Sequence, residues 1–160
     1  MPRLEDLDPE SREFLSAFQC RNETGTPFKK PGKPLSQCRI GVITTSGLVR
    51  KSDRPFELTN PAGDPSFRVI PADTDPAELT FSHVSTNWDR TGFAIDVNVV
   101  MPVDRLRELA AEGIIGSVAR NFYAFMGAIF QFERLVAETA PEVGRRLRED
   151  GVDIALLVPT

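Results

Sequence analysis

The chain has 160 residues, of which 41% are hydrophobic and 26% charged, and its formal net charge is −4. This length fits one domain with its own core, and the acidic balance gives no electrostatic basis for binding nucleic acid or an anionic membrane. No stretch approaches the ~20 apolar residues of a membrane span, and the acidic start lacks a signal region. We therefore expect a cytoplasmic protein with no nucleic-acid or membrane partner.

The cysteine and histidine content argues against a metal site. Cys20 and Cys38 do not form a CxxC pair, and His83 is the single histidine. Two thiols and one imidazole cannot make a conventional zinc site. We expect reduced, buried thiols, as is usual for free cysteine in the cytoplasm.

An opening helix is predicted from Asp8 to Cys20. Asp8 can cap it, Pro9 suits its first position, and Phe14, Leu15 and Phe18 fall on one face at helical spacing. Residues 21–37 contain Gly, Pro, Lys and Ser, which predicts a loop or arm.

The first strand is predicted from Cys38 to Thr45 (CRIGVITT). The dipeptide Ser46-Gly47 marks a turn, and Leu48-Val49 resumes extended structure, so a hairpin is expected. A phosphate-binding loop is the alternative for this turn, but the glycine-rich run closing on Gly-Lys-Ser/Thr is absent.

The middle of the chain is rich in proline. A long connection with five prolines spans residues 54–78, and only 67–70 within it is predicted as a strand. Two further extended segments are expected, from Leu79 to Val84 and from Ala94 to Met101.

The next two segments are predicted to be helical. Pro102 opens a helix that ends at Gly113, with Leu106, Leu109 and Ala110 as its buried stripe. The apolar segment that follows keeps rough helical spacing and is expected to lie in the core: Ile114, Ile115, Val118, Phe122, Phe125, Met126 and Phe130.

The chain closes with a helix and a strand. Thr139 and Glu142 have capping-box spacing, and the helix that follows ends at Gly151, with arginines near its C-terminus. Asp153 to Val158 is predicted to be a buried strand. These elements predict an α/β fold: a single domain with a mixed, partly parallel sheet flanked by helices, ending on a core strand.

His83 is the first candidate for chemistry. It lies near Asp89 and Asp96 in the sequence, and a histidine whose tautomer is fixed by a carboxylate can act as a general base. A hydrogen-bonded structural histidine fits the same pattern. We expect His83 and Asp96 as catalytic candidates.

Further polar residues are candidates for substrate binding. Asp96 and Asn98 interrupt an apolar stretch two residues apart, so both would point to one face of a strand. That face would be either solvent-exposed or part of a polar site. Arg105 could bind a carboxylate with two hydrogen bonds or pair with Glu108. Thr160 lies just past the last predicted strand, at the end where ligands bind in open α/β sheets.

The stretch DVNVVMPVDRLRELAAEGIIGSVARNFYAFMGA (residues 96–128) resembles the glycine/sarcosine/betaine reductase selenoprotein B family, which includes the selenoprotein subunit of D-proline reductase. Residues 51–74 (KSDRPFELTNPAGDPSFRVIPADT) resemble the same family. The resemblance extends from about residue 40 to the C-terminus.

The resemblance implies reductive cleavage of C–N bonds in a small amine or amino acid, with a disulfide as acceptor. It places a selenocysteine or cysteine nucleophile directly after Thr160, and a pyruvoyl group in a partner subunit. We expect the chain to be the N-terminal portion of a longer selenoprotein, with residues 1–37 as an arm and 38–160 as the family-like core. Alone it should be inactive, and it carries no cofactor of its own.

Two other functions fit the residues. The chain could be a shortened, non-catalytic member that binds a small molecule or a partner, or a structural interaction domain. A truncated sheet would leave an unpaired edge and favour self-association into a homo-oligomer.

Overall fold

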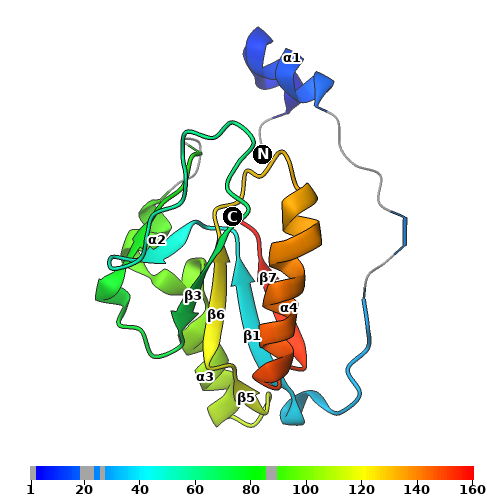
Figure 1. The fold of residues 1–160 in the computed structure, drawn as a ribbon, viewed down its shortest axis with the longest axis vertical. Coiled ribbons are helices and arrows are strands. Elements are labelled where there is room, and N and C mark those ends of the chain that lie inside the picture. Colours follow the sequence, from blue (N-terminus) through cyan, green and yellow to red (C-terminus); the bar gives the residue numbers. More distant parts are fainter. Residues whose placement is uncertain (1–2, 19–23, 26–27, 86–89) are drawn as a thin grey trace. The chain divides into compact units, whose positions relative to one another are not determined.

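The computed structural model describes residues 3–18, 24–25, 28–85 and 90–160. Its contacts divide the chain into two compact units, Met1–Lys30 and Pro31–Thr160. The first contains helix α1 (Pro9–Ala17) and the second contains the sheet (Figure 1). None of the described helices combines the length and apolarity that crossing a membrane would require.

Helix α1 begins as its sequence predicts. The Asp8 side chain accepts the Ser11 N–H over 2.9 Å, and Pro9 occupies the first turn. The helix ends at Ala17, and the predicted end at Cys20 lies outside the described residues. Phe14, Leu15 and Phe18 are all about half exposed or more, so the apolar face is not buried.

The main sheet has five strands: β3 (Phe67–Pro71), β6 (Asn121–Phe125), β1 (Arg39–Thr44), β5 (Ser117–Val118) and β7 (Ile154–Val158). β1 lies at its centre. One edge of β1 pairs in parallel with β7, and the other pairs in parallel with β5 and then β6. β3 is antiparallel to β6, which confirms the predicted mixed sheet.

Helices cover both faces of this sheet. Side chains from α3 (Val103–Ala111) pack with Ile40, Val42 and Phe122 on one face. Side chains from α4 (Ala140–Glu149) pack with Tyr123 and Phe125 on the other. Neighbouring residues of β6 therefore enter different cores, as the alternation of a strand requires. Figure 1 shows α4 lying along the sheet.

The predicted hairpin between residues 38 and 49 is wrong. The turn forms, with Gly47 at φ 69°, but β2 (Leu48–Arg50) pairs antiparallel with β4 (Leu79–Phe81) in a separate two-stranded sheet. Both edges of β1 are already occupied by other strands, so β2 cannot return to it. The predicted strand at 67–70 is confirmed, and that at 79–84 is shorter than predicted.

The predicted strand from Ala94 to Met101 is also wrong. This segment forms α2 (Thr91–Ile95) and the short helix η4 (Val97–Val99). The Asp96 carboxylate accepts the Asn98 N–H over 2.9 Å, and this local bond stabilises a turn in place of a strand.

The predicted helix over residues 114–130 is wrong, because the segment holds β5 and β6. Its role in the core is largely confirmed, since Ile115, Phe122, Phe125 and Met126 are buried, whereas Ile114 and Phe130 are exposed. A strand buried on both faces is apolar throughout, so its sequence loses the alternation that would identify it.

The predicted capping box is not formed. A π-helical turn, η5 (Leu135–Thr139), runs directly into α4, and Thr139 makes no side-chain cap hydrogen bond. Glu142 pairs with Arg145 and Arg146 instead. Two further short helices, η2 (Leu35–Gln37) and η3 (Pro76–Glu78), precede β1 and β4.

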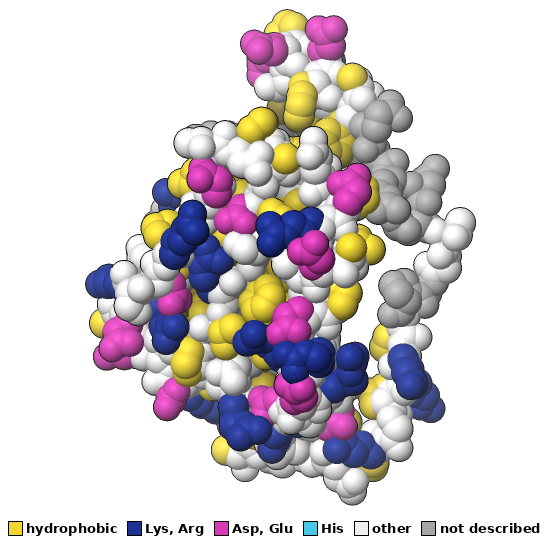
Figure 2. Space-filling view, in the orientation of Figure 1, with side chains coloured by type: hydrophobic (Ala, Val, Ile, Leu, Met, Phe, Trp, Pro, Cys, Tyr) yellow, Lys and Arg dark blue, Asp and Glu magenta, His cyan; other side chains and the backbone are white. Residues whose placement is uncertain are grey.

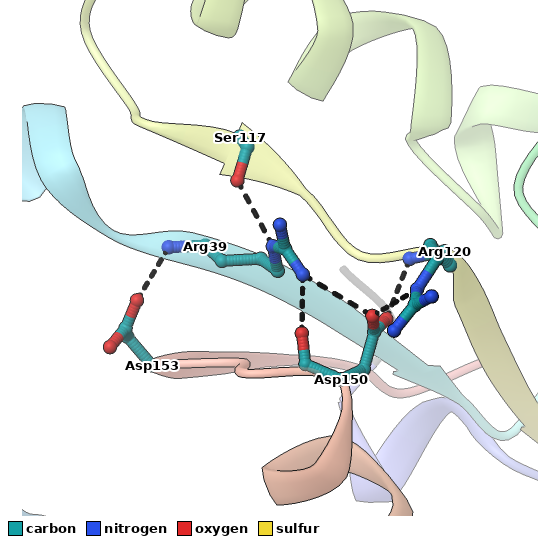
Figure 3. Close-up of polar contacts among 5 residues, drawn as sticks. All are labelled: Arg39, Ser117, Arg120, Asp150 and Asp153. Carbon is teal, nitrogen blue, oxygen red and sulfur yellow. Dashed lines mark hydrogen bonds and ion pairs between the residues drawn. The ribbon is translucent and has the colours of Figure 1, made fainter.

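A polar network joins the amino ends of the strands (Figure 3). The Asp150 carboxylate, only 9% exposed, accepts the N–H and the Nε–H of Arg120, both at 2.7 Å. Arg39 donates to the same carboxylate over 3.3 Å and also donates to Ser117 Oγ. One carboxyl group thus ties the end of α4 to β1 and to the start of β6.

Candidate functional site

The three parallel strands β1, β6 and β7 run toward one end of the sheet, where the C-terminus also lies (Figure 1). This is the end at which open α/β sheets bind ligands. Four residues meet there, and we call them the carboxyl-end site: Thr45, His83, Gly127 and Thr160.

Thr45 connects the end of β1 to the end of β7. Its N–H donates to the Val158 carbonyl over 3.2 Å, and its Oγ1 accepts the Thr160 N–H over 3.0 Å. Thr160 is exposed and Thr45 is half-buried. The last residue of the chain is thus fixed to the loop that follows the central strand.

His83 reaches the same place from β4. The backbone of the preceding residue, Ser82, donates to the Gly47 carbonyl over 2.9 Å and so anchors the segment against the turn after β1. A side-chain carbon added at Gly127 would lie 2.9 Å from the Thr45 carbonyl oxygen and 3.6 Å from His83 Nε2. The glycine, at φ 72°, therefore lets the backbone after β6 pass close to the Thr45 carbonyl, and the imidazole lies at ordinary contact distance from the same position.

The protonation state of His83 follows from its surroundings. Its Nδ1 accepts the Ser85 N–H over 2.9 Å, so the neutral ring carries its proton on Nε2. Burial, together with the positive charge of Arg90, lowers the pKa of His83 below its usual value. At neutral pH the side chain is a neutral imidazole that presents an N–H donor at Nε2.

Two of the predicted site residues, Asp96 and Asn98, form hydrogen bonds at the start of α3. Asn98 Nδ2 donates to Asp96 over 2.8 Å and to Asp104 over 3.1 Å, while Asn98 Oδ1 accepts the Asp104 N–H over 2.9 Å. These bonds hold the first turn of α3. Hydrogen bonds from Asn98 lower the pKa of Asp96, so Asp96 is ionised at neutral pH.

Arg105 lies on the exposed side of α3. It pairs with Glu108 at 2.7 Å, and both side chains are more than half exposed. This is the surface pairing that the sequence left open as an alternative to substrate binding. Asp89, the other carboxylate near His83 in the sequence, lies outside the described residues.

Thr45 and Gly127 were not identified as site residues from the sequence. The signal for Thr45 was two threonines at the end of an apolar strand, which predicts a polar strand end. Gly127 lay in a segment interpreted as helix. Its importance depends on the neighbouring positions of β1 and β6, which no local pattern reveals.

A hollow of about 660 Å³ lies elsewhere, lined by residues that include Arg54, Phe56, Asp64 and Arg134. Arg68, at its base, donates to the carbonyls of Arg54 and Pro55 and lies 4.1 Å from the centre of the Phe56 ring. Its guanidinium thus holds the loop together. Basic and acidic side chains are interspersed on the face shown in Figure 2, so that face offers no uniformly charged surface.

The thiol of Cys38 is buried and free, and it donates to the Pro34 carbonyl over 3.3 Å. This confirms the prediction for Cys38, while Cys20 lies outside the described residues. Within the described part of the chain, no group of three or more His, Cys, Asp or Glu side chains is placed to hold a metal ion.

Comparison with known families matches residues 7–160 to the model of glycine/sarcosine/betaine reductase selenoprotein B. The chain belongs to this family. The family match confirms the resemblance that the sequence motifs carried, and it covers every residue of the carboxyl-end site.

The relatives of this family member are subunits of reductase complexes. The D-proline reductase subunit gamma of Acetoanaerobium sticklandii is 38% identical over 125 residues, which are 78% of this chain and 50% of the relative. The betaine reductase complex component B subunit beta of Peptoclostridium acidaminophilum is 29% identical over 149 residues, 92% of this chain and 34% of the relative.

A third relative, the glycine reductase complex component B subunit gamma of Symbiobacterium thermophilum, is 29% identical over 135 residues, 84% of this chain and 31% of the relative. The matched residues thus make up a third to a half of these selenoprotein B relatives. No solved structure matches the chain.

Proposed function

We propose that this chain is the part of a reductase-complex subunit that holds a redox-active selenocysteine or cysteine directly after Thr160. The observation that supports it most is the carboxyl-end site: Thr160 is bound to Thr45 beside His83, where three parallel strands end. The family match and the names of the relatives support a reductase reaction.

In the proposed reaction the selenolate or thiolate attacks the carbon that bears nitrogen, so that a carbon–chalcogen bond forms as the C–N bond breaks and the protonated amine leaves. One thiolate of a dithiol then attacks the chalcogen, and the carbon leaves with the electron pair and takes up a proton. The second thiol displaces the selenolate or thiolate, which closes the disulfide. A chalcogen needs its anionic form for this step. A pyruvoyl-containing partner subunit is part of the proposal, and the cytoplasm is the compartment in which such a dithiol stays reduced.

His83 contributes a hydrogen-bond donor. The neutral ring carries its proton on Nε2, and in this proposal that N–H stabilises an anion on the residue after Thr160. The sequence suggested a general base, but the tautomer fixed by Ser85 favours a donor instead. Asp96, Asn98 and Arg105 remain predicted site residues, and their contacts in the structure explain them as parts of α3 and its cap.

The proposal is tested first by the gene. A UGA codon after Thr160, followed by an open reading frame with nearby cysteines, supports it, whereas UAA or UAG rejects it. The second test is activity. The full-length protein with its partner subunits should reduce D-proline, glycine, sarcosine or betaine with a dithiol, and the 160-residue chain should not. Turnover by the 160-residue chain would contradict the proposal.

The role of His83 has its own measurement. Replacing His83→Gln keeps an N–H donor but changes its reach, and His83→Ala removes it. We expect His83→Ala to lower kcat at least about tenfold, as for loss of a hydrogen bond to a charged group. An unchanged kcat would assign His83 a structural role.

A further inference from the structure

The loop of residues 54–66, between β2 and β3, is bound to two neighbouring segments. The Phe56 N–H donates to Ser82 Oγ over 2.9 Å. The Ala62 carbonyl accepts the Phe130 N–H over 3.0 Å, from the loop that follows β6. Because β3 is antiparallel to β6, it begins at the carboxyl end of β6. The hollow of about 660 Å³ that this loop lines therefore has walls held by hydrogen bonds, and it lies at the end of the sheet where open α/β folds bind ligands.

Two carboxylates line this hollow, and both are bonded to the loop itself. Glu57 Oε1 accepts the N–H and the hydroxyl of Thr59 over 2.9 Å and 2.6 Å. Asp64 accepts the N–H groups of Glu57 and Ser66 over 2.9 Å and 2.8 Å. Neither carboxylate forms an ion pair with an arginine of the described residues. Their negative charges thus stabilise the turns of the loop.

Two of the three arginines that line the hollow have no carboxylate partner among the described residues: Arg54 and Arg68. Arg68 donates only to neutral acceptors, which are the carbonyls of Arg54, Pro55 and Phe67 and the hydroxyl of Ser66. These bonds leave one N–H of its Nη2 without an acceptor in the described part of the chain. The Arg54 guanidinium makes no hydrogen bond to another described residue, so its donors are available.

The hollow therefore carries an excess of positive charge. Burial lowers the pKa of Arg68, and the positive charge of Arg54 acts in the same direction, while Asp64 and Asp53 oppose it. Both arginines stay protonated at neutral pH. Three arginines face two carboxylates in the lining, a net charge of +1, and an anion beside Arg54 would interact with two cations at once.

We propose that this hollow is a binding site for a small molecule that carries a carboxylate group, with Arg54 as its main partner and the remaining N–H of Arg68 beside it. A guanidinium binds a carboxylate through two parallel hydrogen bonds, and the volume is that of a small-molecule site. The third arginine, Arg134, pairs with Glu138 at 2.9 Å, but both side chains are more than 60% exposed. A pair of this kind is weak, so Arg134 can turn to the ligand. The lining contains no residue of the carboxyl-end site, and the inference goes beyond the proposed function.

The test titrates the 160-residue chain with sodium acetate at pH 7, in exchange for sodium chloride so that ionic strength stays constant. Proton–nitrogen NMR follows the amides of residues 54–68, and acetamide, the neutral analogue, is titrated in parallel. Arg54→Gln removes the charge, and Arg54→Lys keeps the charge but loses the planar fork. Arg148→Gln is the matched control, because Arg148 is exposed on α4 and, like Arg54, forms no ion pair among the described residues.

In the parent, acetate should shift these amides along a saturating curve, and acetamide should leave them in place. Arg54→Gln should raise the acetate concentration at half-saturation about fivefold, the upper range for one exposed ion pair. Arg54→Lys should raise it by less, and Arg148→Gln should keep the parent's curve. A parent response that does not saturate, an equal response to acetamide, or an Arg54→Gln curve that overlays the parent's would overturn the inference.

The Arg54 variants should keep the fold. The Arg54 carbonyl, which accepts from Arg68 Nε, belongs to the backbone and is present in each of them. Unchanged amide signals outside residues 54–68 check this. The assay involves no residue of the carboxyl-end site, so its result is independent of the reductase assay.

Discussion

Removing the Asp150 carboxylate should cost more stability than removing any single surface ion pair. In Asp150→Ala, the Arg120 N–H loses its acceptor, and two guanidinium groups lose theirs (Figure 3). The carboxylate is 9% exposed, whereas the Arg39 and Arg120 side chains are 37% and 77% exposed. The arginines can therefore be rehydrated, and the main cost falls on the Arg120 N–H, which loses its charged acceptor.

The magnitude follows from these contacts. A hydrogen bond from a backbone N–H to a charged acceptor contributes about 1.5–3 kcal/mol, and each exposed arginine pair adds about 0.2–1 kcal/mol. We expect Asp150→Ala to lower the free energy of unfolding by about 3 kcal/mol. For a chain of this size, that corresponds to a fall in Tm of about 6–12 °C.

Urea unfolding at pH 7, followed by circular dichroism, measures this loss. Glu138→Ala is the matched control, because the pair of Glu138 with Arg134 has both side chains more than 60% exposed. It should change stability by no more than about 0.5 kcal/mol. A loss below about 1 kcal/mol for Asp150→Ala would refute the assignment of the network as a structural lock.

The stability lost in Asp150→Ala should depend on pH. Although burial raises it, hydrogen bonds and positive charge from Arg120 and Arg39 bring the pKa of Asp150 below its usual value. A carboxyl group with a lowered pKa stabilises the fold above its unfolded pKa of about 3.9, and that stability is lost as pH falls through the folded value. The gap between parent and Asp150→Ala should stay constant from pH 7 to about 5 and shrink below about 4. A gap that widens in acid would contradict the assignment.

Three further predictions concern other parts of the second unit. Gly127→Ala should destabilise the protein in thermal unfolding by about 1 kcal/mol more than Gly113→Ala, because both glycines have φ near 70° but only the first lacks room for a side chain; equal losses would reject the close approach. Leu157 is 67% exposed, and its strand β7 pairs on one edge only among the described residues, so this edge should promote self-association. Leu157→Lys should then lower the sedimentation coefficient at high protein concentration. An unchanged coefficient would exclude this edge as the interface. Glu142, whose pKa is lowered to about 2 by hydrogen bonds from arginines, should titrate at higher pH in Arg145→Gln by carbon-13 NMR; an unmoved titration would show that Arg145 is not its main partner.

Elements with strong local signals were predicted to within a few residues. β1 and β7 are short apolar runs bounded by turn residues, and α3 begins after Pro102 and ends before Gly113. For these elements the local residues and the tertiary contacts favour the same structure. When local and tertiary preferences agree in this way, the secondary structure of a segment can be predicted from its sequence alone.

The errors occur where pairing is decided at long range. The turn at Gly47 was predicted, but the partner of β2 lies about thirty residues further along the chain. The spacing of Asp96 and Asn98 fits both a strand with the two side chains on one face and a turn closed by a side chain. The hydrogen bond from the Asn98 N–H to the Asp96 carboxylate stabilises the turn. Residues 122–125 are apolar on both faces of the strand, so their sequence shows neither a clear strand period nor a clear helix period.

For the candidate site, too, the individual residues could be predicted from the sequence but their arrangement could not. His83 and Thr160 were chosen separately, one as a lone histidine and the other as the end of a strand. What brings them together is the place of β1 between β6 and β7, because its terminal loop then bonds to β7 through Thr45 and to β6 through Gly47. That order of strands comes from crossover connections, which residue patterns do not specify.

The two ends of the sheet therefore differ in the contacts that stabilise them. At the amino end, one buried carboxylate fixes α4, β1 and β6 with charged hydrogen bonds. At the carboxyl end, Thr45 makes one backbone and one side-chain hydrogen bond to the end of β7, and Gly127 lies close to the Thr45 carbonyl. Substitutions at Asp150 should thus lower stability while the pKa of His83 stays unchanged, and Thr45→Val should leave stability nearly unchanged while the Thr160 amide exchanges faster. NMR titration of His83 in both sets of variants would reveal any coupling between the ends, and a shifted pKa in Asp150→Ala would show that the division is false.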